Sequence, residues 1–446
     1  MTKDMTKGSP WRLIFFFTVP VLLGNIFQQL YSMVDTIIVG RFVSVQALAA
    51  VGATGSISFL VIGFATGITS GFGIVIAQKF GAGDEKAVRR SVGVSIVLCI
   101  IITIILTILS LTTSRFVLEL MNTPDDIIND AVIYINIIYA GIFATIYYNM
   151  VASILRALGD SKTPLYFLIL SSILNVVLDL VLIINFHMGV AGAGIATVFS
   201  QFVSAVLCTI YTIKRYSILK LKKSDFRVNK TWAWAHLRVG LPMALQFSVT
   251  AVGVMVLQSA LNVFGSEVIA SFTAASKVET LVTQTMNSLG TTMATFCGQN
   301  LGAGKWRRIK KGMQVGMIFS AGCVLIAALI NFTLGTAATR LFMTDPSDEI
   351  IGYARTYLYI TTLFYPFLAA IYLFRNSLQG MGDAMIPMIG GVAELISRLG
   401  VAVILPIFIG YIGVCLASPA AWFVTGMILT VRYILLIKKQ MRMQAE

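Results

Sequence analysis

An apolar stretch near the amino terminus, Pro20–Arg41, carries a single acidic residue, Asp35. On a helix, Asn25, Gln28, Ser32 and Asp35 share one face, because they are three or four residues apart. A carboxylate at membrane depth costs about 3 kcal/mol on insertion scales, so it normally faces a partner or a water-filled cavity. Asp35 is therefore a candidate for binding a cation or a proton. The alternative is an acid near a helix end that reaches the membrane interface.

Two later apolar segments carry similar polar stripes at helical spacing. The stripes are formed by Ser171, Asn175 and Asp179 in one segment and by Thr197, Gln201 and Ser204 in the other. Carboxylate, amide and hydroxyl oxygens suit a hard cation such as Na⁺, and the carboxylates can equally take up a proton. Spacing alone leaves open whether these groups form an ion site or only join one helix to the next.

The composition indicates an all-α polytopic membrane protein. Of its 446 residues, 57% are hydrophobic and only 12% are charged, whereas soluble proteins contain about 25% charged residues. Apolar runs long enough to span a bilayer recur along the whole chain. We expect twelve spans, at roughly 14–38, 47–77, 92–113, 130–157, 165–186, 191–213, 240–262, 268–297, 313–335, 354–378, 387–408 and 412–437.

The net charge of +14 comes from basic residues in alternate loops. The positive-inside rule places these loops and both termini in the cytoplasm, and the loops containing Asp125 and Glu267 outside. The basic residues meet lipid headgroups, so no nucleic-acid partner is expected. Lys214–Arg238 is read as an interfacial helix between the halves. The five cysteines show no paired spacing, which predicts no disulfide and no bound cofactor or structural metal.

The chain repeats itself at a separation of about 222 residues. Gln78–Gly83 (QKFGAG) recurs as Gln299–Gly304 (QNLGAG), and the ALGD ending at Asp160 recurs as the GMGD ending at Asp383. Each half contains six spans, so both halves enter from the same side and the repeat is parallel. This predicts two lobes, 1–213 and 239–446, joined by a linker at 214–238, with a site between the lobes.

The second half does not repeat the acids of the first. Leu257 or Gln258 answers to Asp35, and Ala402 lies near the place answering to Asp179. Glu394 and Arg398 are four residues apart, which favours a structural ion pair. Polar, thioether and aromatic side chains are candidates for lining a substrate cleft, because thioethers and rings adapt to varied ligands. They are Gln28, Ser32, Met33, Tyr139 and Gln201 in the first half, and Gln246, Glu279, Met286 and Asn287 in the second.

At these motifs the chain resembles the multidrug and toxic compound extrusion (MATE) family, over nearly its whole length. The resemblance implies a V of two lobes and export of organic, often cationic, compounds driven by entering Na⁺ or H⁺. It also implies a cation site at the positions of Asp35, Asn175, Asp179 and Thr197. The spans corresponding to seven and ten carry no acid here, unlike NorM-like members, so the chain is most similar to DinF-like or MepA-like bacterial members.

The expected protein is thus a monomeric transporter of the cytoplasmic membrane, whose partners are small organic cations or drugs and the lipid bilayer. One rival is a flippase for lipid-linked oligosaccharides or other lipids, which calls for a larger, more basic cleft. A membrane enzyme is the other rival. The repeated loops GAGDEKAVRR and RALGDSKTP contain no His or Cys for catalysis, which argues against an enzyme.

Overall fold

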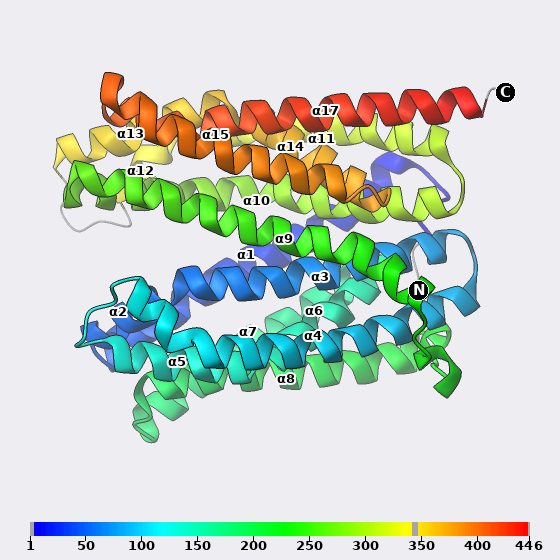
Figure 1. Ribbon diagram of the computed structural model, residues 1–446, viewed down its shortest axis with the longest axis horizontal. Coiled ribbons are helices and arrows are strands. Elements are labelled where there is room, and N and C mark those ends of the chain that lie inside the picture. Colours follow the sequence, from blue (N-terminus) through cyan, green and yellow to red (C-terminus); the bar gives the residue numbers. More distant parts are fainter. Residues whose placement is uncertain (1–3, 341–346, 445–446) are drawn as a thin grey trace. The chain divides into compact units, whose positions relative to one another are not determined.

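Long apolar helices form almost all of the structure, a computed structural model that describes residues 4–340 and 347–444 (Figure 1). In the first half they are α1 (Pro10–Phe42), α2 (Val45–Ala53), α3 (Gly55–Gly81), α4 (Glu85–Leu120), α5 (Ile128–Ala140), α6 (Ile142–Ala157), α7 (Lys162–Leu180) and α8 (Gly189–Arg215). In the second half they are α9 (Lys230–Leu261), α10 (Ser266–Gly302), α11 (Trp306–Thr333), α12 (Gly335–Arg340), α13 (Asp348–Leu363), α14 (Tyr365–Gly380), α15 (Met385–Ile409), α16 (Tyr411–Cys415) and α17 (Ala417–Met443). No strand occurs in the described ranges.

The helices divide into two compact units. Unit 1 contains Met1–Met5 and Leu23–Ser248, and unit 2 contains Thr6–Leu22 and Val249–Glu446. The first part of α1 therefore belongs to unit 2, and the first part of α9 belongs to unit 1. The lobe and linker boundaries expected from the sequence stay a prediction.

Among the described residues, nine helices are long and apolar enough to cross a membrane, or up to eleven if each bent helix pair is one span. The bent pairs are α5 with α6, at 45°, and α13 with α14, at 53°. The expected eighth span corresponds to α10, a helix of 37 residues that is not among these candidates. Its many hydroxyl and amide side chains lower its mean hydropathy. The expected count of twelve is compatible with this arrangement.

The sequence repeat corresponds to repeated backbone geometry. Gly83 and Gly304, which end the two QxxGAG-type loops, have φ of 74° and 70°. Gly159 and Gly382, which precede the repeated aspartates, have φ of 83° and 84°. Glycine adopts this left-handed conformation without the steric cost that a side chain adds. The repeated glycines are thus required by the turns that follow α3, α6, α10 and α14.

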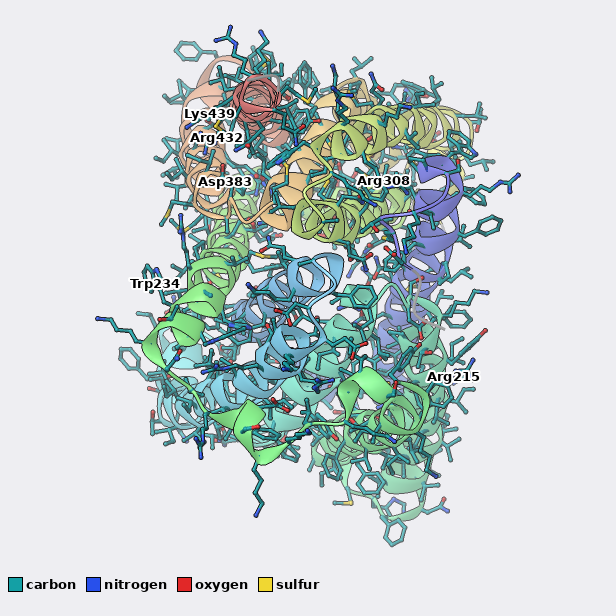
Figure 2. The ribbon with its side chains drawn as sticks, turned by 90° about the vertical axis from the view of Figure 1, so that its right-hand side faces the viewer. Arg215, Trp234, Arg308, Asp383, Arg432 and Lys439 are labelled. Carbon is teal, nitrogen blue, oxygen red and sulfur yellow. The ribbon has the colours of Figure 1, made fainter. Side chains whose placement is uncertain are left out.

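The repeated aspartates bind to the last long helix of their own half. Asp160 accepts a hydrogen bond from the hydroxyl of Tyr216, which directly follows α8. Asp383 accepts one from Nε of Arg432 on α17 at 2.6 Å (Figure 2). Asp160 also accepts hydrogen bonds from the backbone N–H groups of Lys162 and Thr163, at 3.0 Å each. Both loops are therefore held to the end of their own half by hydrogen bonds.

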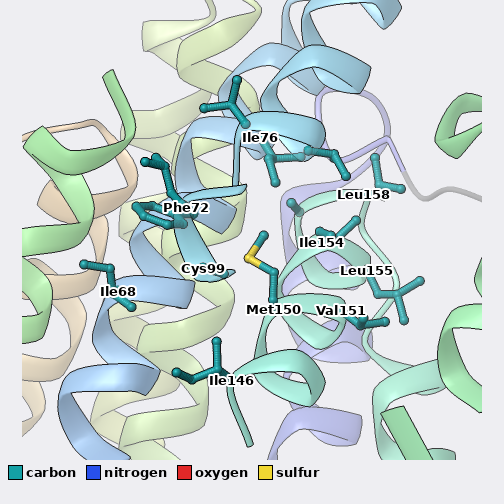
Figure 3. Close-up of a cluster of buried hydrophobic side chains, with 14 of the residues drawn as sticks. Ile68, Phe72, Ile76, Cys99, Ile146, Met150, Val151, Ile154, Leu155 and Leu158 are labelled. Carbon is teal, nitrogen blue, oxygen red and sulfur yellow. The ribbon is translucent and has the colours of Figure 1, made fainter. Parts of the chain in front are cut away.

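A hydrophobic core in unit 1 forms between α3, α4 and α6 (Figure 3). Phe72 and Leu155 are fully buried in it, and Met150 and Cys99 fill the space between the helices. Unit 2 has its own core, in which Leu257 of α9 packs with buried residues of α10, α13 and α16. These cores hold the helices that carry the polar residues described below.

The segment between the halves differs from the expected separate interfacial helix. Its first part forms short 3₁₀ turns at Ser217–Leu219 and Lys223–Phe226. Its end is the beginning of α9, which continues without a break into the apolar span. The ring of Trp232 lies under Lys79 Nζ at 5.6 Å and Arg90 Cζ at 5.0 Å. Cation–π contacts thus attach this part of α9 to the ends of α3 and α4.

Candidate functional site

The four residues expected to bind a cation come together inside unit 1. Asp35 lies on α1, Asn175 and Asp179 lie on α7, and Thr197 lies on α8. Asp35 is 8% exposed, and Asn175 and Asp179 are fully buried. The two carboxyl groups lie within electrostatic reach of each other. Three separate helices thus direct to one place the residues that the family resemblance implied.

Hydrogen bonds to one hydroxyl connect these helices. The amide nitrogen of Asn175 donates to Oγ1 of Thr197 at 3.3 Å. The hydroxyl of Tyr31, on α1, lies 3.3 Å from the same oxygen. Tyr31 and Tyr134 also lie within electrostatic reach of both acids. Tyr31 precedes Asp35 by one helical turn, so spacing could have placed it at the site, whereas nothing in the sequence marked Tyr134.

Several hydrogen-bond acceptors at this site have no donor among the described residues. Within the described chain, no hydrogen-bond partner is found for Oδ1 of Asp35, Oδ1 of Asn175 or either carboxylate oxygen of Asp179. Neither acid forms an ion pair with any described residue. A buried acceptor without a donor loses about 1–3 kcal/mol of hydration. A cation or a proton supplies what these oxygens lack, so the residues fit either one.

The end of α7 departs from regular α-helix directly after this site. Val181–Asn185 form a π-helical turn that begins two residues after Asp179. Single π-helical turns often occur at functional sites, because they change the direction of the side chains around them. The described residues contain no group of three or more His, Cys, Asp or Glu side chains placed to hold a metal. The oxygen donors fit a hard cation such as Na⁺ rather than a transition metal.

A second polar region is a cavity within unit 2, with a volume of about 490 Å³. Glu279 of α10, Arg375 of α14 and Arg398 of α15 contribute to its wall. The carboxylate of Glu394 joins the two arginines: it accepts from Nη2 of Arg375 at 2.8 Å and from Nη2 of Arg398 at 2.9 Å. The expected pair of Glu394 and Arg398 is confirmed, and Arg375 makes it a triad.

Glu279 is held separately from this triad. The hydroxyl of Tyr357, on α13, donates to its Oε2. Its Oε1 is buried and has no hydrogen-bond partner in the described ranges. Glu279 was expected among the substrate-cleft residues, whereas nothing in the sequence marked Tyr357, which lies 78 residues away in the chain.

The nine residues expected to line a substrate cleft lie in several environments. Only Glu279 and Asn287 line the unit 2 cavity. Gln28, Ser32 and Met33 are exposed, while Tyr139, Gln246 and Met286 are buried. Gln201 accepts a hydrogen bond from Thr145 at 2.6 Å. Their assignment to substrate binding stays a prediction. Lys277, Arg375 and Arg398 also line the cavity. The sequence had favoured a structural ion pair for Arg398 and had given no role to the other two.

Known proteins are similar to this chain in sequence and in fold. The probable multidrug resistance protein YpnP of Bacillus subtilis is 28% identical over 383 residues, which cover 85% of this chain and 84% of YpnP. YoeA, a second probable multidrug resistance protein of that organism, is 28% identical over 455 residues, covering 99% of this chain and 97% of YoeA.

A solved structure is described as the outward-facing conformation of a multidrug resistance MATE family transporter of the MOP superfamily. It superposes with a TM-score of 0.92 at 23% identity and covers 98% of each chain. This likeness confirms the all-α, polytopic MATE-type fold. The family model MatE matches residues 20–181 and 242–404, one segment in each half and well over half of the sequence. The chain therefore belongs to the MatE family.

Proposed function

We propose that this protein is a secondary active transporter, which exports organic compounds, cationic drugs among them, in exchange for H⁺ or Na⁺ entering the cell. The observation that carries the proposal is the pair of buried carboxylates, Asp35 and Asp179, without ion-pair partners in the described chain. Intramembrane acids that lack a partner are typical of ion and proton pathways. Membership of the MatE family and relatives named as multidrug resistance proteins support export of drugs.

Binding of the coupling ion changes the charge of the site. Asp35 and Asp179, with the amide oxygen of Asn175 and the hydroxyl of Thr197, are the groups that would hold Na⁺; a proton would bind to one of the carboxylates. Either ion reduces the repulsion between the two acids. The helices α1, α7 and α8 can then pack more closely than they do around two uncompensated charges.

Exchange follows from thermodynamic linkage. If the ion binds one conformation of the transporter more tightly and the organic substrate binds the other, each ligand shifts the conformational equilibrium against the other. A coupling free energy of about 1–3 kcal/mol changes affinity by roughly 5–150-fold. Entry of the ion from outside thereby lowers the affinity for substrate and releases it outward.

The remaining expectations belong to the same proposal. The transporter acts in the cytoplasmic membrane as a monomer, with both termini in the cytoplasm, as the distribution of basic residues predicts. No cofactor other than the coupling ion is needed for such exchange. Multidrug resistance relatives favour drug export over the flippase alternative.

The test is efflux of a fluorescent organic cation from vesicles that contain the full-length protein, with Na⁺ and pH gradients imposed separately. The gradient that drives efflux identifies the coupling ion. In the variant Asp35→Asn, ion-driven efflux should fall by about tenfold or more, because the amide cannot bind the ion as a charged ligand. The protein should still reach the membrane, since neutralising a buried acid removes a desolvation cost.

The matched control is Asp125→Asn, which removes an exposed acid of an outer loop and should leave efflux unchanged. Normal ion-driven efflux by the Asp35→Asn variant would contradict the proposed coupling site. Efflux that neither gradient drives would contradict the exchange mechanism as a whole.

A further inference from the structure

The unit 2 cavity occupies the place in the repeat that the cation site occupies in unit 1. Pro164 answers to Pro387 and Gly192 to Gly413, so α7 corresponds to α15 and α8 to α16 with α17. In this register three counterparts line the cavity. Glu394 is at the position equivalent to Ser171, Arg398 at that of Asn175, and Ser418 at that of Thr197. One scaffold position therefore carries an acceptor-rich group in unit 1 and arginine in unit 2.

The same register explains how a guanidinium fits there. Pro20 answers to Pro242, which makes Gly253 the counterpart of Tyr31. A Cβ atom added at Gly253 would lie 2.8 Å from Nη1 of Arg398. A larger residue at this point of α9 would require the guanidinium of Arg398 to shift. The exchange of Tyr31 for Gly253 thus accompanies the exchange of Asn175 for Arg398.

The charges that line the cavity favour an anion. Three of them are basic, Lys277, Arg375 and Arg398, and two are acidic, Glu279 and Glu394. The carboxylate of Glu394 lies between two guanidiniums and neutralises only one of them.

The other acid, Glu279, accepts a hydrogen bond from Tyr357 and attracts Arg398 electrostatically, without an ion pair to it in the described chain. Lys277 is exposed, and no described acid pairs with it. The wall therefore carries one more positive than negative side chain, which favours an additional anion.

Burial strengthens the interactions that the two arginines can make with a ligand. The side chains of Arg375, Glu394 and Arg398 are only 13%, 11% and 7% exposed. Nε of Arg398 is buried and has no hydrogen-bond partner among the described residues. Guanidinium groups recognise carboxylates through paired N–H donors, and such charge-assisted bonds are among the strong ones in proteins. Away from bulk water these interactions are screened little.

The rest of the wall suits the body of an aromatic compound. Phe272, Tyr372 and Trp422 supply rings, and Leu368 and Ile371 supply aliphatic surface. A volume of about 490 Å³ lies within the range of about 300–1,000 Å³ that drug-sized ligands occupy. Hydroxyl and amide side chains, among them Thr283 and Gln284, complete the wall and can bond to polar groups of a ligand.

We infer that this cavity binds the carboxylate of an aromatic organic compound, through Arg375, Arg398 and Lys277. The inference rests on the proposed function only for the step of export; binding itself requires no ion gradient. It extends the expected substrates from cations to molecules that carry an anionic group. The negative site in unit 1 and the positive cavity in unit 2 then serve different ligands.

The test uses a rhodamine free acid and its methyl ester, which share one ring system and differ in the carboxylate. Binding of each dye to the purified full-length protein is measured by fluorescence anisotropy at fixed pH and salt, without membranes. The wild type should bind the acid about tenfold more tightly than the ester, the effect of one charge-assisted bond. Equal affinity, tighter binding of the ester, or binding of neither dye would overturn the inference.

Two variants test whether the basic residues of the cavity cause the preference for the acid. Lys277→Gln alters an exposed side chain, and Arg375→Gln leaves the pair of Glu394 and Arg398 in place. Each should reduce the preference for the acid by about threefold or more, with little change for the ester. Lys439→Gln, on the exposed end of α17, is the control and should change neither affinity. If both cavity variants keep the wild-type preference, the carboxylate binds elsewhere and the inference fails.

The outcome separates this inference from the proposed function. The Asp35→Asn variant should lose ion-driven efflux and retain the preference for the acid. A protein that binds the acid but shows no ion-driven efflux would contradict only the exchange mechanism. A protein that exports cations by exchange and shows no preference for the acid would contradict only the assignment of the cavity.

Discussion

Units 1 and 2 share a repeated backbone, but the buried acids of unit 1 have no basic partner among the described residues and a buried acid of unit 2 has two. In unit 1, Asp35 and Asp179 lie next to each other without a basic partner in the described chain. In unit 2, Glu394 is held by two arginines, at 2.8 and 2.9 Å. The unpaired acids can bind an ion, whereas Glu394, bound by two arginines, joins α14 to α15.

The comparison shows which features the repeat preserves. Both halves keep the left-handed glycines of the loops, the prolines inside α1 and α9, and a bend between consecutive helices. These features determine the path of the backbone. The polar side chains at equivalent positions have diverged completely, from Asn175 to Arg398 and from Asp179 to Ala402. Fold symmetry therefore does not imply two equivalent ion sites.

The contrast between the units requires that the ion-paired triad of Arg375, Glu394 and Arg398 stabilises unit 2. Replacing Arg398 in the variant Arg398→Met removes one of two guanidiniums that bind Glu394 and keeps a side chain of similar length. Removing one partner of a buried ion pair costs about 3–5 kcal/mol, so the melting temperature of the purified protein should fall markedly. The measurement is thermal unfolding in detergent, followed by loss of monodisperse protein.

The matched change in unit 1 is Asp179→Asn, which removes a charge that has no basic partner. It should leave the melting temperature unchanged or raise it, since no ion pair is lost. The exposed control, Lys439→Met, should have almost no effect. Equal destabilisation by Arg398→Met and Asp179→Asn would show that both regions are structural, and the contrast would be lost.

A second prediction concerns the shared backbone. The variants Gly83→Ala and Gly304→Ala introduce a side chain where φ is 74° and 70° and where no atom lies within 4 Å of the new Cβ. Only backbone strain changes, so each should lower the free energy of unfolding by about 1–2 kcal/mol. Thermal unfolding should show the same shift in both halves.

The control for these variants is Gly322→Ala within α11, where the added Cβ also meets nothing within 4 Å. Alanine favours a helix interior over glycine by about 1 kcal/mol, so this variant should be no less stable than the wild type. Clearly different shifts for Gly83→Ala and Gly304→Ala would mean that the two loops have separate structural roles, despite their similar sequences.

Much of the fold could be predicted from the sequence, because membrane spans and repeats are local or periodic signals. The apolar runs predicted the helices, and the motifs ending at Gly83 and Gly304 predicted the repeat. The long polar helix α10 also lay where a span was expected, although its composition alone would not identify it as one. Exact helix ends and the bends between pairs were not predicted, since they depend on packing.

The candidate site was predicted where its residues share a helix face. Asn175 and Asp179 are one turn apart, so spacing alone placed them together. Spacing cannot show contacts between distant segments. The bond from Tyr357 to Glu279 and the bond from Arg375 to Glu394 join different helices, and both were missed. Such contacts follow from tertiary packing, which a single sequence does not reveal.

The smallest effect expected concerns Tyr31, whose hydroxyl lies 3.3 Å from Oγ1 of Thr197 at the edge of the unit 1 site. The variant Tyr31→Phe keeps the ring and removes this contact, so that α1 loses a link to α8. One hydrogen bond contributes about 0.5–1.5 kcal/mol, so efflux should need roughly three- to tenfold more coupling ion for half-maximal rate. The measurement is efflux at a series of ion concentrations.

Tyr166→Phe, which removes an exposed hydroxyl from α7, is the control and should leave the ion dependence unchanged. In unit 2 the position of Tyr31 is held by Gly253, next to Arg398. A Tyr31→Phe variant with altered ion dependence and unaltered preference for the rhodamine acid would therefore assign the two ligands to different units. If the change at Tyr31 instead alters the affinity for the acid and leaves the ion dependence unchanged, the division of roles between the units is wrong.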